Sequence, residues 1–408
     1  MKTMKRIAVL IIAMVLSAGI IYAQNNTANT HQQGSSNTAT QTQTGGDNDG
    51  KIFQGNFQEG WDQNDGIASQ TQTGDRNVGE IKQRSGSWGS GNTSLQTQIG
   101  DDNQAFSTMW NAANYSEQNQ TGMRNYTKVK IAGDGNTAYV NQIGNDHKAH
   151  TELTGGVDNN LANTYQTGGS NIGYMQAKGD GNSMHIIQHG SMNEAGEDPW
   201  YADNDGDNIK NVGILIEGNN NFAQEYQQGD NNKATYGVSG YSNVFYGTQV
   251  GDENIYKIDQ YNLKDVENYQ NYVSTVQQGN LNEAYGKLKG DMNVIQFLQS
   301  GDENMIEGLT TPEFMFEGDN SSVTVLQYGT ENTTKGEVHN MSGDVNIYQS
   351  GSKNLTEVEI GNSLLWHNMV DVDQMGMENY AKVQQTTSGN NATIYQNGNS
   401  NSSTVTQH

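Results

Sequence analysis

The chain has 408 residues, of which 32% are hydrophobic and 8% aromatic, and its formal net charge is −24. This composition excludes a conventional apolar core for a chain of that length, and the acidic balance argues against nucleic-acid binding, which needs clustered Lys and Arg. The absence of Cys excludes disulfides, thiolate zinc sites and iron–sulfur clusters. The polarity comes instead from 53 Asn and 37 Gln, beside 49 Gly and only 2 Pro. Disordered chains are usually rich in Pro and charge, so this composition favours a regular structure that uses the amides.

The N-terminal segment 1–23 is typical of a signal peptide. Lys2, Lys5 and Arg6 precede the apolar run 7–16, and small residues follow the run. A membrane anchor is the alternative, but the run is short and no second hydrophobic stretch follows it. We therefore expect an exported protein with no membrane span after the signal peptide is removed.

The rest of the chain is organised by a repeated Gly-x-x-Asn tetrad. Successive tetrads begin 11 residues apart, and alternate tetrads carry a Gln two residues before the Gly, so the full repeat is 22 residues. At Asn111 an Asn takes the place of the Gly, which its tolerance of the left-handed region permits. At His147 a His takes the place of the final Asn.

The structural residues of the repeat are Gln98, Gly100, Asn103, Gln120, Gly122, Asn125, Gln142, Gly144, Gln166, Gly168, Asn171, Gln188, Gly190, Asn193, Gln227, Gly229, Asn232, Gln249, Gly251, Asn254, Gln277, Gly279, Asn282, Gln299, Gly301, Asn304, Gln327, Gly329, Asn332, Gln349, Gly351, Asn354, Gln374, Gly376, Asn379, Gln396, Gly398 and Asn401.

Eleven residues suit one short strand and one tight turn, since Gly and Asn tolerate positive φ. Alternation supports this: Ala284 and Leu288 fall on one face, whereas Tyr285 and Lys287 fall on the other. The sequence predicts an all-β fold, a β-solenoid of stacked strand-turn-strand coils with two facing parallel sheets. If coils rise by about 4.8 Å, the Gln and Asn side chains stack into hydrogen-bonded ladders, which satisfies amides that would be costly to bury alone.

Four stretches break the phase of the repeat, at 46–66, 194–212, 260–275 and 305–316. Pro199 and Pro312 lie inside two of them. A proline lacks a backbone donor, so these stretches are predicted to be loops that leave the stack.

The Gln-x-Gly-x-x-Asn unit, followed by Ala and alternating β-branched or aliphatic residues, resembles the curlin repeat of curli amyloid subunits. The resemblance covers roughly 34–401, and the Asn/Gln-rich segment 24–33 resembles the leader that these subunits use for export. We place the repeats in 34–408, with room for about sixteen, which is more than familiar curlins carry. The resemblance implies a bacterial surface protein that passes through an outer-membrane secretion pore and polymerises with itself, and with a nucleator subunit, into adhesive biofilm fibres.

Both ends of the repeat array follow the strand alternation, at 37–43 and 401–407, so we expect both ends to pair with further strands. Addition of strands from head to tail is a contact that does not close, and it produces filaments. A monomeric adhesin with ligand contacts in 194–212 and 305–316 is one alternative. An ice-binding solenoid is another, suggested by outward threonines at Thr38, Thr40, Thr42 and Thr44.

Catalytic and metal sites have little support in the sequence. No nucleophile elbow, Walker loop or His-Glu-x-x-His motif occurs, so we expect neither an enzyme nor a cofactor. His185 and His189 are four residues apart, which would suit a metal on a helix, but on a strand His185 is expected to point outward and His189 to sit at the turn, so both are read as surface histidines. Asp203, Asp205 and Asp207 form an acidic stretch that is a weak calcium candidate, since the twelfth position lacks the Glu of an EF-hand.

Overall fold

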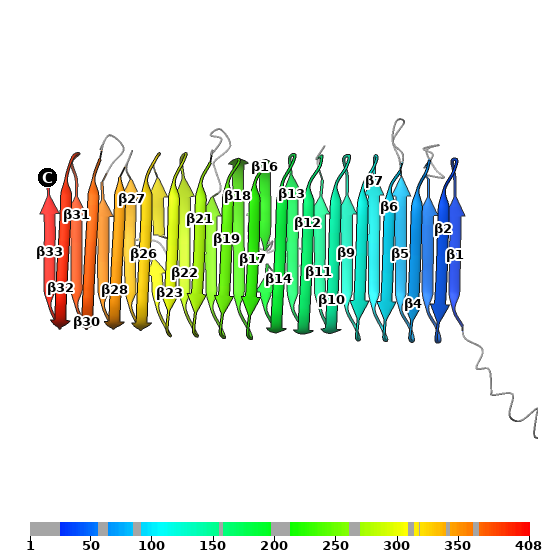
Figure 1. Cartoon of the computed structure of the whole chain (residues 1–408), viewed down its shortest axis with the longest axis horizontal. Coiled ribbons are helices and arrows are strands. Elements are labelled where there is room, and N and C mark those ends of the chain that lie inside the picture. Colours follow the sequence, from blue (N-terminus) through cyan, green and yellow to red (C-terminus); the bar gives the residue numbers. More distant parts are fainter. Residues whose placement is uncertain are drawn as a thin grey trace, which may run out of the picture.

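The computed structural model describes residues 25–55, 64–84, 91–154, 158–196, 213–260, 270–308, 314–317, 319–339, 343–361 and 367–408. Within these ranges every regular element is a β-strand, and the strands form two parallel sheets, here named sheet A and sheet B. Successive strands largely alternate between the sheets, and Figure 1 shows the resulting row from β1 to β33 with nearly parallel strand axes and with the arrows of one sheet opposite to those of the other. The prediction of an all-β solenoid with two parallel sheets is confirmed.

Sheet A has 18 strands. Its strands are β1 (Thr27–Gln32), β3 (Asp49–Gln54), β5 (Val78–Arg84), β7 (Gln104–Trp110), β9 (Tyr126–Ile131), β11 (Lys148–Leu153), β13 (Ile172–Lys178), β15 (Glu194–Ala195), β16 (Ile214–Asn219), β18 (Lys233–Tyr241), β20 (Ile255–Gln260), β22 (Glu283–Lys289), β24 (Met305–Glu307), β25 (Phe314–Glu317), β27 (Thr333–His339), β29 (Leu355–Ile360), β31 (Tyr380–Gln385) and β33 (Ser402–Gln407).

Sheet B has 15 strands. Its strands are β2 (Thr38–Thr44), β4 (Ile67–Thr73), β6 (Thr93–Ile99), β8 (Tyr115–Thr121), β10 (Thr137–Asn145), β12 (Leu161–Gly169), β14 (Ser183–Ser191), β17 (Phe222–Gln228), β19 (Val244–Val250), β21 (Tyr272–Gln278), β23 (Val294–Ser300), β26 (Ser322–Thr330), β28 (Asp344–Ser352), β30 (Met369–Met377) and β32 (Asn391–Asn399).

Strand register repeats from coil to coil because the same repeat positions always pair. In sheet B, Gln120 lies opposite Gln142, which is 22 residues later. Between β14 and β17 the separation grows to 39 residues, yet Gln188 still lies opposite Gln227. The longer separation therefore does not shift the register of the described strands.

The four expected loops are narrower than the sequence suggested. Strand β3 lies within 46–66, β15 within 194–212, the start of β21 within 260–275, and β24 with part of β25 within 305–316. Phase breaks in the sequence suggested loops, but hydrogen bonds from the coils above and below hold these short segments in the sheet. Pro199 and Pro312 lie outside the described residues.

Two layers of sheet A are each built from two short strands. Strands β15 and β16 both lie between β13 and β18, and β24 and β25 both lie between β22 and β27. The 18 strands of sheet A therefore make 16 layers, against 15 layers in sheet B.

The core lies between the sheets and is formed by every second residue of each strand. In β22, Ala284 and Leu288 are buried, whereas Tyr285 and Lys287 are partly exposed, as predicted. One apolar cluster runs from Met109 to Ile394. Because each coil packs its few aliphatic residues against the coils above and below, a chain of low hydrophobicity forms a continuous core.

Candidate functional site

The turns that follow sheet B use positive φ at two positions of the tetrad. Gly122 has φ 120° and Arg124 has φ 56°. A Cβ on Gly122 would lie 1.9 Å from the carbonyl oxygen of Gly144 in the next coil, so only Gly fits the first position. The final Asn was expected to share this role, but no Asn in that position has positive φ in the described turns. It acts through its side chain instead.

The side chain of that Asn links consecutive coils. The Asn125 backbone N–H donates to Oδ1 of Asn103 at 3.0 Å, and its Nδ2 donates to the carbonyl oxygen of Gly144 at 2.8 Å. The same contact continues through Asn26, Asn48, Asn77, Asn103, Asn125, His147, Asn171, Asn193, Asn232, Asn254, Asn282, Asn304, Asn332, Asn354, Asn379 and Asn401. The structure thus brings all the Asn residues expected in the repeat into one ladder.

A second Asn ladder lies at the opposite edge of the stack, at the end of the turns that follow sheet A. Its members are Asn92, Asn114, Asn136, Asn160, Asn182, Asn221, Asn243, Asn271 and Asn293. These residues were absent from the expected set, although the 11-residue spacing of the tetrads already contained their signal.

A Gln ladder runs inside sheet B along its whole length. In each step Nε2 of one Gln donates to Oε1 of the Gln in the next coil, at 2.7 to 3.1 Å. Its members are Gln43, Gln72, Gln98, Gln120, Gln142, Gln166, Gln188, Gln227, Gln249, Gln277, Gln299, Gln327, Gln349, Gln374 and Gln396. All bonds point the same way, so the ladder is polar from end to end.

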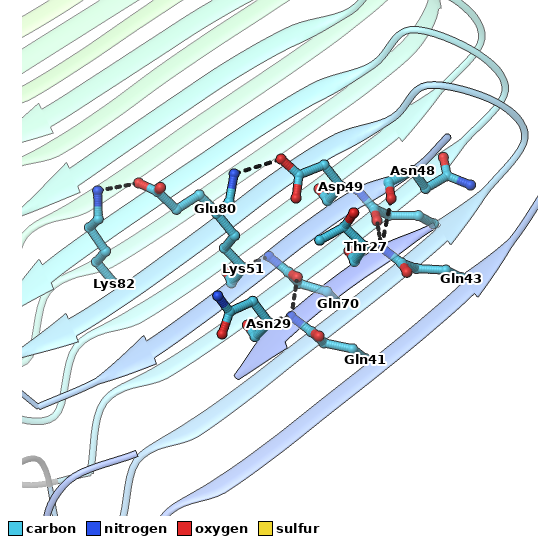
Figure 2. A network of polar contacts seen from close by, with 11 residues as sticks. Thr27, Asn29, Gln41, Gln43, Asn48, Asp49, Lys51, Gln70, Glu80 and Lys82 are labelled. Carbon is cyan, nitrogen blue, oxygen red and sulfur yellow. Dashed lines mark hydrogen bonds and ion pairs between the residues drawn. The ribbon is translucent and has the colours of Figure 1, made fainter. Parts of the chain in front are cut away.

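The N-terminal coils carry more amides in their core than the rest. Gln41, Gln70, Gln96 and Gln118 form an additional ladder beside the main one, and the local apolar cluster is small, built on Ile52, Ala68 and Ile81. Figure 2 shows the start of this network, where Gln41 and Gln43 of β2 reach the backbone of β1. The first coils are therefore held mainly by hydrogen bonds.

His147 replaces an Asn in the first Asn ladder. The Asn171 backbone N–H donates to Nδ1 of His147 at 3.2 Å, and Nε2 of His147 lies 3.2 Å from the carbonyl oxygen of Ile143. An accepting Nδ1 requires the neutral ring with its proton on Nε2. Burial lowers the pKa of His147, which favours that neutral form.

An acidic residue lies in the core near the middle of the stack. Glu225 of β17, Tyr236 of β18 and Tyr256 of β20 are fully or almost fully buried, and their polar atoms converge on Gly247. A Cβ on Gly247 would lie 1.7 Å from the Tyr236 hydroxyl and 2.4 Å from Oε2 of Glu225. Burial raises the pKa of Glu225 well above its usual value, which favours the uncharged carboxyl. The inward position of Glu225 was not expected from the sequence.

The outer faces of the two sheets differ in charge. Every Lys and Arg within a described strand belongs to sheet A. Many of them pair with a carboxylate, as in Lys130–Glu152 and Lys178–Glu217, both at 2.6 Å, and in Lys51–Asp49 and Lys82–Glu80 (Figure 2). In the strands of sheet B, the outward acidic residues are Glu117, Asp344, Asp371 and Asp373. The sequence predicted outward lysines, but it did not indicate that all lysines of the described strands belong to one sheet.

Both ends of the described stack are strand edges. Strand β1 pairs with β3 and β2 with β4, while at the other end β32 pairs with β30 and β33 with β31. Among the described strands, none lies beyond these four, so their outer backbone groups are available to another strand.

The structure describes the two histidines that were considered as metal ligands, but not the acidic stretch. His185 and His189 both lie on the outer side of β14, where His189 contacts Thr167 at 2.7 Å and His185 contacts Ser183 at 2.9 Å. No group of three or more metal-ligating side chains occurs in the described ranges. Asp203, Asp205 and Asp207 lie outside them. No helix in the described part of the chain is long and apolar enough to cross a membrane.

Comparison with known families is consistent with this geometry. The family model of the curlin associated repeat matches residues 158–190 and 376–408. A search of curated proteins gives no match. Each matched stretch contains the Gly, Asn and Gln residues that form the turns and ladders described above. The 22-residue coil, the paired ladders and these two matches show that the chain contains repeats of the curlin type.

Proposed function

We propose that the protein is a structural subunit that assembles head to tail into extracellular curli-type fibres for cell adhesion and biofilm matrix. The observation that carries the proposal is that both ends of the stack are strand edges with the same in-register repeat. The family and the fold favour a structural over a catalytic role, and the family is one of extracellular surface fibres. Export by segment 1–23, passage through an outer-membrane pore and a nucleator partner belong to the same proposal.

The two ends are complementary in their hydrogen bonds. At the first coil, Oε1 of Gln43 accepts no hydrogen bond from the described residues, and at the last coil Nε2 of Gln396 donates only to the Tyr380 backbone. Since every Gln in the ladder donates toward the next coil, Gln396 of one copy has a donor for Gln43 of the following copy. The ladder then continues across the junction, and the fibre has one polarity.

The layer count supports one arrangement of the proposed junction. Sheet A has 16 layers and sheet B has 15, so placing β33 directly on β1 leaves sheet B one strand short. The gap closes if β33 of one copy replaces β1 of the next and pairs with β3. The two strands occupy the same place in the repeat, since Asn26 and Gln32 correspond to Asn401 and Gln407. Strand β1 is exposed along its whole length, so little burial is lost when it leaves.

Seeded assembly tests the proposal. The full chain, purified in denaturant and diluted into saline buffer, should form thioflavin T-positive fibres that seed fresh protein. Fibre diffraction should give a meridional spacing of about 4.8 Å. A β-rich chain that stays monomeric with or without seeds would overturn the proposal.

A specific observation favours one second candidate, an ice-binding or surface-binding solenoid. The outward threonines Thr38, Thr40, Thr42 and Thr44 of β2 continue as Thr71 and Thr73 in β4, and as Thr97 in β6. The array then gives way to Ile99 and, in β8, to Tyr115 and Glu117. Thermal hysteresis of the dilute chain separates the candidates, because a fibre subunit should show none.

A further inference from the structure

One stretch of the outer face of sheet B carries no formal charge. In the eight strands β10, β12, β14, β17, β19, β21, β23 and β26, no outward side chain is Asp, Glu, Lys or Arg. The only such residue in these strands is Glu225, which points into the core. We call this stretch the neutral face.

The neutral face is apolar as well as uncharged. Of the thirteen large hydrophobic side chains that are exposed in the described residues, nine lie in strands of sheet B and four in turns, whereas none lies in a strand of sheet A. Three of the nine, Tyr139, Ile143 and Tyr246, belong to the neutral face. Within the neutral face, Ile143 is 42% exposed and Tyr246 is 38% exposed. These side chains contact solvent on a surface where charged neighbours are absent.

Aromatic rings form a row across the neutral face. Their centroids are 5.7 Å apart for His185 and Phe222, 5.2 Å for Phe222 and Tyr246, and 6.0 Å for Tyr246 and Tyr272. The row crosses four consecutive strands of sheet B. Tyrosine-rich, charge-depleted surfaces are characteristic of the buried centre of protein interfaces.

We propose that the neutral face is a lateral interface, which packs against the neutral face of a second copy of this chain. Net charge is one argument for this partner. The chain carries a charge of −24, so copies repel one another, and burying an unpaired charge costs several kcal/mol. The neutral face can lose its water without burying a formal charge, whereas the outside of sheet A cannot.

Shape and area are the second argument. Figure 1 shows strand axes that stay nearly parallel along the whole stack, and untwisted sheets over many strands are typically stabilised by stacking. Eight strands about 4.8 Å apart, each about 23 Å long, present roughly 900 Å² per copy and roughly 1,800 Å² for a pair, the size of a standard specific interface. A second copy repeats at the same strand spacing, so the two rows of side chains can interdigitate along the whole face.

This interface is separate from the ends of the stack. If the chain assembles head to tail, the lateral interface joins fibres side by side. If the chain stays monomeric, the same interface joins two solenoids. The lateral interface therefore does not rest on the proposed function. The two can therefore fail independently.

Because the chain has no Cys, one Cys introduced on a chosen face allows the solvent accessibility of that face to be measured by thiol labelling. Thr248→Cys places a thiol on the neutral face in β19, and Ser239→Cys places one on the outside of sheet A in β18, with both native side chains partly exposed. The full chain is assembled and treated with a water-soluble maleimide. We expect Thr248→Cys to label at least tenfold more slowly than Ser239→Cys in the assembled state, and both to label rapidly in dilute monomer. Equal rates in the assembled state would overturn the proposal.

A charge substitution gives a second measurement. Thr248→Lys and Ser239→Lys are compared by the width of fibres in negative stain and by sedimentation velocity of the soluble fraction. We expect Thr248→Lys to give single fibres, or monomers if no fibres form, and Ser239→Lys to keep the paired state of the unsubstituted chain. If both variants keep the paired state, the lateral interface is contradicted. It is also contradicted if neither the variants nor the unsubstituted chain forms pairs.

A flat polysaccharide is the competing occupant. Incubating Thr248→Cys with microcrystalline cellulose or chitin tests it directly. Protection of the thiol by the polysaccharide, with no protection by self-association, would replace the second copy as the occupant. Protection by self-association alone supports the lateral interface.

Discussion

At the scale of single residues, the stack depends on amides that would be costly to bury if they stood alone. Each ladder Gln satisfies its own donors and completes the acceptors of the neighbouring coils. Gln299, for example, accepts from Gln277 and donates to Gln327 and to the backbone of Glu283 and Asn304. The same chemistry repeats in every coil, so a local change tests the whole arrangement.

Gln299→Leu should therefore be destabilising. The substitution leaves Oε1 of Gln327 without its ladder donor and removes a partner from Nε2 of Gln277, at a cost of about 1–3 kcal/mol for each group left unsatisfied. Urea unfolding of the soluble chain measures the change, and thioflavin T kinetics should show slower assembly. Gln296→Leu is the matched control, since Gln296 lies on the same strand but is exposed. Equal stability of the two variants would contradict the ladder argument.

His147 should make stability depend on pH. Burial lowers its pKa below the ordinary value of 6.5, so the unfolded chain takes up a proton more readily than the folded chain as the pH falls. The contribution of neutral His147 is fully present above pH 6.5 and is lost as the pH falls through the folded pKa. His147→Asn restores the usual ladder residue and should remove this loss. Urea midpoints of parent and variant, compared at about pH 7.5 and about pH 5, should diverge at the lower pH; parallel midpoints argue against it.

Glu225 should act with the opposite sign. Burial raises its pKa well above the ordinary value of 4.5, so its contribution is fully present below that value and is lost as the pH rises toward the folded pKa. Glu225→Gln cannot ionise and should be more stable than the parent at alkaline pH. Glu117→Gln, on the outer side of β8, is the control and should follow the parent. A parent and Glu225→Gln with the same stability at about pH 9 would mean that the carboxyl ionises without penalty.

At the scale of elements, the ends of the stack differ from its interior. Interior strands have a partner on each side, whereas β1 and β33 have one each among the described strands. Strand β1 also contributes no buried side chain. An element of this kind separates from a sheet more easily than any interior strand.

A disulfide that holds β1 on β3 should block elongation. Asn29 lies opposite Lys51 in the strand register, so Asn29→Cys with Lys51→Cys can form a bridge between neighbouring strands. If β33 must replace β1, the oxidised variant should elongate seeds at least tenfold more slowly, and reduction should restore the rate. Lys382→Cys with Thr404→Cys bridges β31 and β33 at the other end and should elongate normally. Normal elongation by the oxidised β1–β3 variant would show that β1 stays in place in the fibre.

At the scale of the whole molecule, charge is divided between the two sheets. The lysines and most carboxylates of the described strands lie on sheet A, where exposed ion pairs contribute little to stability. The excess of acidic residues nevertheless repels other copies over distances set by salt. We therefore expect the rate of assembly to depend on the net charge of the surface more than on individual ion pairs.

Added salt should speed assembly while barely changing the stability of the monomer. Raising sodium chloride from about 0.01 M to about 0.5 M shortens the screening length from about 30 Å to less than 10 Å, which weakens repulsion between copies. The lag time of thioflavin T fluorescence should fall accordingly, and the urea midpoint should stay nearly constant. A lag time that lengthens with salt would mean that attraction between opposite charges drives association.

The repeat positions of this chain were predictable because their spacing alone specifies them. Glycines at the turns, Gln and Asn on the inward row, and alternation along each strand follow from the periods of 11 and 22 residues. The second Asn ladder was available from the same spacing. These features depend on neighbours within one or two coils, which is the range over which a sequence pattern carries information.

The sequence by itself determined the coil, its period and its ladders, because identical residues at identical spacing can satisfy buried amides in only one arrangement. The tertiary structure decided the rest. It shows that β1 belongs to the stack and that short segments beside the insertions remain in the sheet. It also places the Glu225 carboxyl near two tyrosine hydroxyls and the strand lysines on sheet A. These features depend on which strands lie next to one another when the stretches of sequence between them differ in length. Stacking places residues that are far apart in the chain next to one another in continuous columns. The charge and polarity of a sheet face are the sum over these columns, so they are defined only in the folded stack.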